Sequence, residues 1–426
     1  MAALDGPAWL RDRRAAAFER YEAAGLPTEA EEVWRYSRIE DLDLDAYQPP
    51  DRSGDGKEPA VPGEVQPVLD AVGDRAALLV LRNGRPVHAE VDPALAERGL
   101  VVGSLADSPA GDGLLGAAAS RSDAFTELST AFLVDGALVD VPRGVTAEKP
   151  VVVVHWVDAA ADGSSVFPRT IVRAGEASEV TVLDYLASSD VSLLAGPVVE
   201  LVADAAAFLR YCNVQELGPR VWQVGYQASR VGRVATLESS TVALGGDYAR
   251  VRTDSKLVGD GGTSHLLAVY FGDGGQMHDF RTMQDHDAPR TTSDLLFKGA
   301  VTDQAHSVYS GLIRIARGAA GTKAFQTNRN LVLAEGARAD SVPNLEIDEN
   351  DVRCSHASAV GPVDPEQRYY LEARGIPTDV ADRLIVLGFF DEVVTRTPVA
   401  GLHPLLRLAV AAKLAGSATA LTGVAP

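Results

Sequence analysis

Turn-type residues recur every fourteen or fifteen positions through the middle of this 426-residue chain, and this spacing constrains the fold most strongly. Runs rich in Val, Leu and Thr lie between them, without helical periodicity. One step fits one strand plus one bend, and two steps fit one coil of a β-solenoid. The recurring positions are Gly175, Asp190, Asp204, Gly218, Gly232, Gly246, Gly261, Gly275, Pro289, Asp303 and Gly318.

We therefore predict a mainly β protein with a right-handed parallel β-helix over residues 131–352. An antiparallel sandwich is the alternative, because 39 glycines make near-matches to any spacing easy to find. The absence of intervening helical patterns disfavours a sheet built from alternating strands and helices. A solenoid exposes strand edges at both ends, and these edges need covering.

The region before the solenoid, residues 1–130, is expected to be helical with a small α/β part. Residues 7–24 read as a helix, since Pro7 suits its start and Gly25 its end. The Pro/Gly/Ser/Asp-rich stretch near 49–67 is expected to be a linker. A hairpin is predicted over 78–91, because Asn83-Gly84 suits a type I′ turn.

The region after the solenoid, residues 353–426, is predicted to be a helical domain. Asp364 can cap a first helix and Gly375 can end it. In the second helix, apolar residues fall near one face. The predicted helices span Pro365–Arg374, Thr378–Thr395 and about Pro404–Leu414.

Composition and motifs exclude several classes of function. The formal charge is −20 and no Lys/Arg block is present, which argues against nucleic-acid binding. No stretch has the length of a membrane span and the N-terminus does not resemble a signal peptide, so a cytoplasmic protein is expected. Phosphate-loop, dinucleotide, zinc-protease and serine-hydrolase motifs are missing, which predicts a non-enzyme that binds no nucleotide.

Cys354-Ser355-His356 is the best local candidate for metal chemistry. Thiolate and imidazole both suit iron, and a spacing of two places both side chains on one face of a strand. A free cysteine is nonetheless more often a small buried apolar residue, and Cys212 is assigned that role. His278, His286 and His306 are expected to be structural.

Four thiolates usually hold an iron–sulfur cluster, and this chain has 2 cysteines. Any such chemistry must share ligands with another molecule.

Several stretches resemble the SufB/SufD family, and SufD more than SufB. The N-terminal part carries Leu26-Pro27-Thr28 and Glu32-Val33-Trp34-Arg35-Tyr36. Further stretches, including the Cys354-Ser355-His356 run, lie within and after the predicted solenoid: 291–299, 326–331, 343–347, 352–356, Asp364, 370–371 and 374–377. The resemblance spans about residues 26–395.

This resemblance implies a scaffold for iron–sulfur cluster assembly, working with a SufB-like subunit and a SufC-like ATPase. The ATPase would dock on the C-terminal helical region, with Thr378–Thr395 as the expected contact. A transient cluster or iron, shared with the partner, would involve His356 and its neighbour Cys354. Ala357 departs from the family, which commonly has glycine there, and would be costly if the position needed φ > 0.

Three alternatives remain at this stage. The chain could be a SufB-like subunit, or it could form a homodimeric scaffold. A β-helix carbohydrate-active enzyme would need clustered carboxylates or a basic group along one groove, and the sequence offers none convincingly placed.

Overall fold

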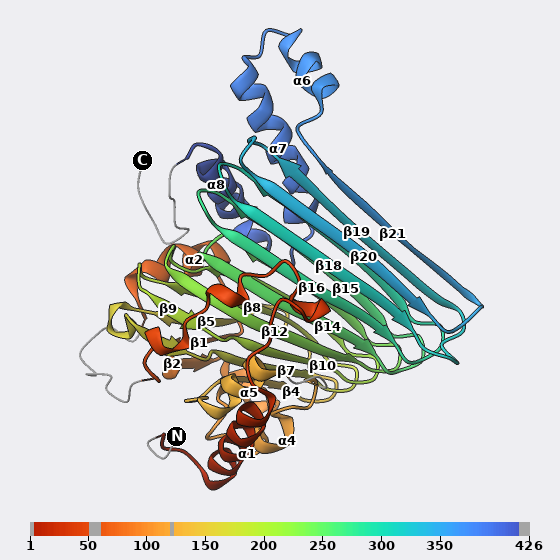
Figure 1. The fold of residues 1–426 in the computed structure, drawn as a ribbon. Helices are drawn as coiled ribbons and strands as arrows, with labels where there is room; N and C mark the ends of the chain where they lie inside the picture. The colour runs from red at the N-terminus through yellow and green to blue at the C-terminus, as the bar shows by residue number, and fades with distance from the viewer. Residues whose placement is uncertain (1–3, 51–60, 120–122, 417–426) are drawn as a thin grey trace.

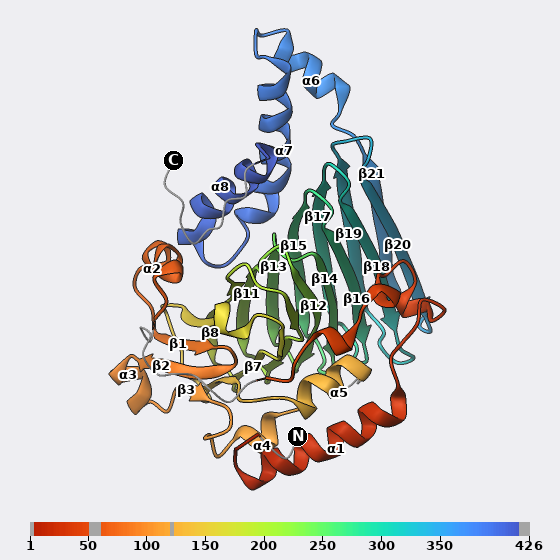
Figure 2. The same ribbon diagram turned by 60° about the vertical axis from the view of Figure 1, so that its left-hand side comes forward.

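A computed structural model describes residues 4–50, 61–119 and 123–416. Within these ranges the strands form two sheets, of 10 and 11 strands, which face each other across a shared interior (Figures 1 and 2). The chain alternates between the sheets, so that Tyr248–Leu257 (β14) pairs in parallel with Met277–His286 (β16) one coil later. The predicted parallel β-solenoid is confirmed.

Each sheet follows the chain in steps of one coil. In spatial order, the 10-stranded sheet consists of β2 (Arg85–Val91), β1 (Ala77–Arg82), β5 (Val151–Val157), β8 (Glu179–Ser188), β11 (Phe208–Glu216), β13 (Thr236–Ala243), β15 (Thr263–Gly272), β17 (Thr292–Val301), β19 (Thr322–Val332) and β21 (Val352–Gly361). The 11-stranded sheet consists of β20 (Arg338–Ile347), β18 (His306–Ile315), β16, β14, β12 (Val221–Val231), β10 (Val198–Ala203), β7 (Arg169–Ala174), β4 (Ala137–Val141) and β3 (Val101–Ser104), with β9 (Leu193–Ala195) pairing β12 and β6 (Ser164–Val166) pairing β9.

The predicted bends coincide with the bends of the structure. All the recurring positions from Gly175 to Gly318 lie between strands. Several have a left-handed backbone there, with φ of 90° at Gly246, 69° at Gly261 and 55° at Asp303. Glycine and aspartate tolerate this conformation better than β-branched residues do, which is why these residue types mark the corners.

Alternating side chains explain how one strand serves two surfaces. In β15, Leu266, Ala268 and Tyr270 point into the solenoid and join an apolar cluster there. Leu267 and Phe271 point outward and are covered by the C-terminal helices. Because both faces are buried, the strand is a nearly continuous apolar run.

The N-terminal region contains the predicted helix and hairpin. Helix α1 (Ala8–Ala24) follows Pro7 and ends at Gly25, whose φ is 69°. The β1–β2 turn has φ of 49° at Asn83 and 80° at Gly84, as a type I′ turn requires. Residues 51–60 of the expected linker lie outside the described residues. The remaining helices of the region are η1 (Glu32–Trp34), η2 (Ile39–Asp41), η3 (Leu44–Ala46), η4 (Gly63–Val65), α2 (Gln66–Val72), α3 (Pro93–Glu97), α4 (Gly111–Leu114) and α5 (Ala124–Ala131), with η5 (Ala159–Ala161) following β5.

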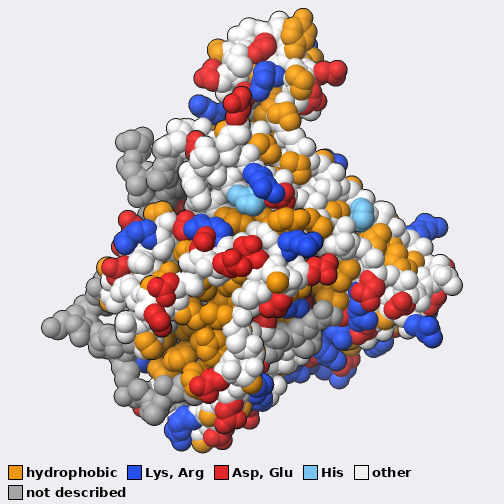
Figure 3. Space-filling model, in the orientation of Figure 1, with side chains coloured by type: hydrophobic (Ala, Val, Ile, Leu, Met, Phe, Trp, Pro, Cys, Tyr) orange, Lys and Arg blue, Asp and Glu red, His pale blue; other side chains and the backbone are white. Residues whose placement is uncertain are grey.

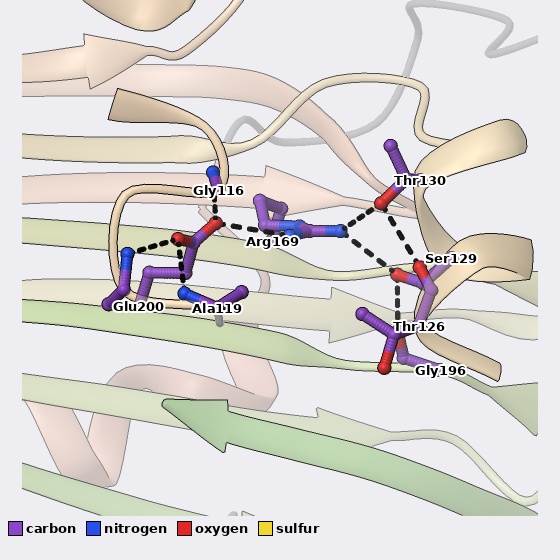
Figure 4. A network of polar contacts seen from close by, with 9 residues as sticks. Gly116, Ala119, Thr126, Ser129, Thr130, Arg169, Gly196 and Glu200 are labelled. Carbon is purple, nitrogen blue, oxygen red and sulfur yellow. Dashed lines mark hydrogen bonds and ion pairs between the residues drawn. The ribbon is translucent and has the colours of Figure 1, made fainter. Parts of the chain in front are cut away.

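A buried ion pair fastens this region to the first coils (Figure 4). Arg169 Nη1 lies 3.3 Å from Glu200 Oε1, and both side chains are almost fully buried. The Glu200 carboxylate also accepts hydrogen bonds from the backbone N–H groups of Gly116, Ala118 and Ala119, just after α4. Arg169 Nη2 donates to Thr130 Oγ1 in α5, at 3.0 Å. The pair therefore joins β7 and β10 to the segment after α4 and to α5.

The C-terminal helices match the predicted ones. They are α6 (Pro365–Glu372), α7 (Thr378–Val394) and α8 (His403–Leu414), with η6 (Ala400–Leu402) before α8. Asp364 caps α6 by accepting from the Glu366 N–H at 2.9 Å, and Gly375 has φ of 82°. The second half of α7 packs against the outer face of the 10-stranded sheet, whereas α6 projects beyond it and buries no residue (Figures 1 and 2).

The expected boundary between solenoid and helices, at 352/353, falls at the start of β21. That strand runs on to Gly361 as the last strand of its sheet, and the helices begin at Pro365. Among the described residues, no helix is long and apolar enough to span a membrane.

Candidate functional site

The two ends of the solenoid differ in how they are covered. At the N-terminal end, β2 and β3 pair antiparallel with β1 and β4 and close the two sheets. At the C-terminal end, β20 and β21 are the last strands and most of their residues are exposed. Apolar side chains are also exposed on this last coil: Val342, Leu345, Ile347 and Val360.

Cys354 and His356 both lie on β21, at this open end. In the parallel register with β19, Cys354 pairs with Ala324 and His356 with Gln326. Ala324 and Gln326 are buried while Phe325 is exposed, so Cys354 and His356 share the face that looks into the solenoid. The structure thus brings the two candidate ligands onto one face, as their spacing predicts.

The two side chains differ in burial. Cys354 is partly buried and packs against an apolar cluster that includes Ile313, Ile315 and Ala324. Burial raises the pKa of its thiol, so the free thiol is protonated near neutral pH. The His356 side chain is exposed, and its ring nitrogens make no hydrogen bond to any described residue.

Ala357 is not strained. It lies within β21 and is not among the residues with positive φ, so this position does not need glycine. The departure from the family pattern therefore leaves the backbone beside His356 in ordinary extended conformation.

A chain of hydrogen bonds ties the last coil to the interior. Ser358 Oγ donates to Ser341 Oγ across the two sheets at 2.8 Å, and Ser341 Oγ donates to Asn328 Oδ1 at 2.7 Å. Asn330 Nδ2 also donates to Asn328 Oδ1, at 2.8 Å, and Tyr270 Oη donates to Asn330 Oδ1 at 2.7 Å. These contacts hold β20 and β21 together at the open end.

His278, His286 and Cys212 lie on strands below the last coil. His286 is buried, and its ring nitrogens contact the hydroxyls of Thr291 and Ser293. Burial lowers the pKa of His286 to about 4 and that of His278 to about 3. Burial raises the pKa of Cys212 to about 11, in keeping with a buried apolar role.

His306 is satisfied within the fold, since its Nε2 lies 2.7 Å from Asp340 Oδ2. No group of three or more His, Cys, Asp or Glu side chains that could hold a metal ion is found in the described part of the chain. The open end thus offers two donors, Cys354 and His356, and a complete metal site would need others from outside.

Sequence reasoning missed the polar residues beneath the open end. Gln326, Asn328 and Asn330 alternate along β19 and are all buried, facing the interior. The sequence does contain a sign of them, because three polar residues occupy every second position of a predicted core strand. Buried polar groups usually form a hydrogen-bond network or a functional site.

The chain is similar to proteins of iron–sulfur cluster assembly. The family described as "SUF system FeS cluster assembly, SufBD core domain" matches residues 156–389. An iron–sulfur cluster assembly SufBD family protein of Mycobacterium tuberculosis is 36% identical over 309 residues, which cover 70% of this chain and 76% of that protein. SufD of Bacillus subtilis is 28% identical over 94% of this chain and 93% of its own length. SufD of Escherichia coli is 27% identical over 92% and 90%, respectively.

Proposed function

Because the chain belongs to the SufB/SufD family of iron–sulfur cluster assembly, as a SufD-type protein, we propose that it is a non-catalytic scaffold subunit of a cytoplasmic assembly complex. In this proposal it works with a SufB-like subunit and a SufC-like ATPase. The open end of the solenoid is the observation that carries the proposal. It combines two unpaired strand edges with the two candidate iron ligands.

The open end suits association with another β-rich subunit. Edge strands present unpaired N–H and C=O groups that can pair with a strand of a partner. The exposed Val342, Leu345, Ile347 and Val360 add apolar area that such a partner would bury. A second solenoid of the same family has strands of the right kind to continue the stack.

Ligand sharing follows from the donor count. A nascent cluster is the substrate here, and Cys354 and His356 supply fewer donors than the four that clusters usually need. The partner would supply the remaining ligands at the shared edge. Since the free Cys354 thiol is protonated, loading the cluster releases a proton from it if Cys354 becomes a ligand.

The ATPase is proposed to dock on the helical projection. Tyr369 and Tyr370 on α6 are 72% and 58% exposed, and they line a shallow hollow with Pro365, Glu366, Ala373 and Arg374. Figure 3 shows hydrophobic side chains on this projection at the top of the molecule. Exposed tyrosines beside an arginine are typical of binding hot spots.

Within α7, the earlier expected contact, Glu392 is no free surface group. It forms an ion pair with Lys298 of β17, whose side chain is 3% exposed. Changing Glu392 would therefore disturb the packing of the helix on the sheet, and α6 is the fairer place for a test.

Co-purification of the tagged full chain from its host tests the proposal. We expect a second SufB/SufD-type subunit and an ATPase, identified by mass. Val360→Lys should lose the subunit and keep the ATPase, because a lysine at the open end opposes strand pairing. Tyr369→Asp should do the reverse.

Val234→Lys is the matched control, since Val234 is an exposed apolar residue in a bend remote from both surfaces. It should retain both partners. Recovery of this chain alone, or only of further copies of itself, would contradict the heteromeric scaffold and would favour a homodimer in the second case.

A further inference from the structure

The side chain of a buried glutamine one coil below the open end has no hydrogen-bond partner in the described part of the chain. Gln326 on β19 is 1% exposed, and neither its Oε1 nor its Nε2 bonds to any described residue. Leaving both polar atoms of a buried amide unpaired costs stability, and native proteins contain few such groups. The packing of the free chain does not account for this residue.

The space that holds the amide is built into the fold. On the facing strand β18, position 311 is glycine, and a Cβ there would stand 2.8 Å from Gln326 Cδ and closer still to Nε2. The Tyr309 hydroxyl borders the same position, and its bonded partner is Thr282 Oγ1 at 3.0 Å. The missing side chain at Gly311 therefore leaves room for the Gln326 carboxamide, although the carboxamide makes no hydrogen bond in that space.

Of the residues stacked directly below and above Gln326 in its sheet, only the one above has a polar side chain. Leu295 of β17 lies below it in the register, and His356 of β21 lies above it. Pro343, which lies above Gly311 on the other sheet, has neither a polar side chain nor a backbone N–H. The exposed His356 ring in turn has no hydrogen-bond partner among the described residues, so two side chains without such a partner are stacked on one face.

We infer that the Gln326 carboxamide is a positioning residue for His356: it holds the imidazole by a hydrogen bond when the other ring nitrogen binds iron. This inference rests on the ligand role proposed above for His356. A metal-binding histidine almost always donates its second ring N–H to an oxygen acceptor, which fixes the tautomer and the ring orientation. Gln326 Oε1 is an acceptor of that kind, and the terminal torsion of glutamine is soft enough to turn it toward the ring.

The test is an anaerobic titration of Fe(II) into the complex that contains the full chain, alongside thermal unfolding of the chain. Gln326→Met keeps the length of the side chain but removes both polar atoms. We expect iron affinity to fall about 10- to 100-fold, the usual effect of losing such a partner. The unfolding temperature should stay unchanged or rise, because an unpaired buried amide is removed. Removing a purely structural glutamine would not combine a loss of iron affinity with an unchanged or raised unfolding temperature.

Two further variants sharpen the result. Gln326→Glu keeps an oxygen acceptor and should recover most of the iron affinity despite lower stability. Gln215→Met is the matched control: Gln215 on β11 is also 1% exposed, its Nε2 donates to Gln223 Oε1 at 2.7 Å, and its Oε1 accepts from the Gly245 N–H at 2.9 Å. It should lower the unfolding temperature and leave iron affinity unchanged.

The same titration separates the two proposals. If His356→Ala weakens iron binding and Gln326→Met does not, the positioning role is wrong and the ligand role stands. If His356→Ala leaves iron affinity at the wild-type value, the ligand role itself fails. Gln326→Met should add nothing in the His356→Ala background, and a full additional loss there would also overturn the inference.

Discussion

The two ends of this solenoid differ in whether their strand edges are covered. The N-terminal end is closed by antiparallel strands and by helices fastened through the buried pair Arg169–Glu200. Its interior is filled by Val, Leu and Ala. The C-terminal end has exposed edges, and its interior carries Gln326, Asn328 and Asn330 instead.

In the proposed function, this difference separates a structural end from an end that binds a partner. Exposed edges invite uncontrolled pairing, and proteins usually blunt or cover them. Here the chain covers the strand edges at the N-terminal end. At the C-terminal end the edges stay exposed and carry apolar side chains and a histidine. Such an arrangement is tolerable when a specific partner occupies the surface, which is what a shared cluster site would require.

The largest expected effect lies at the closed end. Glu200→Gln should lower the free energy of unfolding by about 3–5 kcal/mol, because it leaves the Arg169 guanidinium buried without its counter-charge. Burial already lowers the pKa of Arg169, and the Glu200 charge opposes that shift. Denaturant unfolding of the full chain measures the change.

The matched control is Glu346→Gln on β20 of the open end, where the glutamate is exposed. It should change the free energy of unfolding by less than about 0.5 kcal/mol. Equal losses from the two variants would show that the ends do not differ as described.

A second, smaller effect on the free energy of unfolding concerns the outer face of the 11-stranded sheet, where the N-terminal segment packs. It appears only in acid. Asp279 on β16 is fully buried, and although burial opposes it, Arg250 and Arg281 hold the pKa of its carboxyl below the usual 3.8. The same arginines donate to the carbonyls of Val33 and Arg35, at 2.6 Å each, and so fix the N-terminal segment to the outer face of the sheet.

The direction in which the free energy of unfolding changes with pH follows from the lowered pKa of Asp279. A carboxyl whose pKa is lower in the folded state contributes stability that is fully present above pH 3.8 and is lost as pH falls through the folded value. The free energy of unfolding should therefore fall more steeply in acid for the wild type than for Asp279→Asn. Parallel pH profiles for the two proteins would contradict this account.

Much of the fold could be predicted because it rests on local and repeated constraints. Each corner needs a residue that tolerates an unusual backbone, so Gly246, Gly261 and Asp303 mark the spacing in the sequence itself. The caps at Asp364 and Gly375 are equally local. These features depend on neighbours within a few positions, which a single sequence contains.

The rest depends on residues that are far apart in the chain. The contacts of Arg250 and Arg281 with the segment around Trp34 join positions more than 200 residues apart. The stacking of Gln326 under His356 requires the register of β19 and β21, which the spacing of bends does not supply. The same register explains why β21 belongs to the solenoid although only three residues separate it from the helices.

The central claim is that the open end provides an iron ligand, and cluster formation in the assembled complex tests it most directly. His356→Ala is compared with Ser355→Ala, the exposed neighbour on the opposite face of β21. Cluster is measured by its absorption and iron content, and stability by thermal unfolding. We predict that His356→Ala loses the cluster and keeps the unfolding temperature, since an exposed side chain contributes little to packing, while Ser355→Ala keeps both. Full cluster formation in His356→Ala with the partner subunits present would contradict the account, as would a joint loss of cluster and stability.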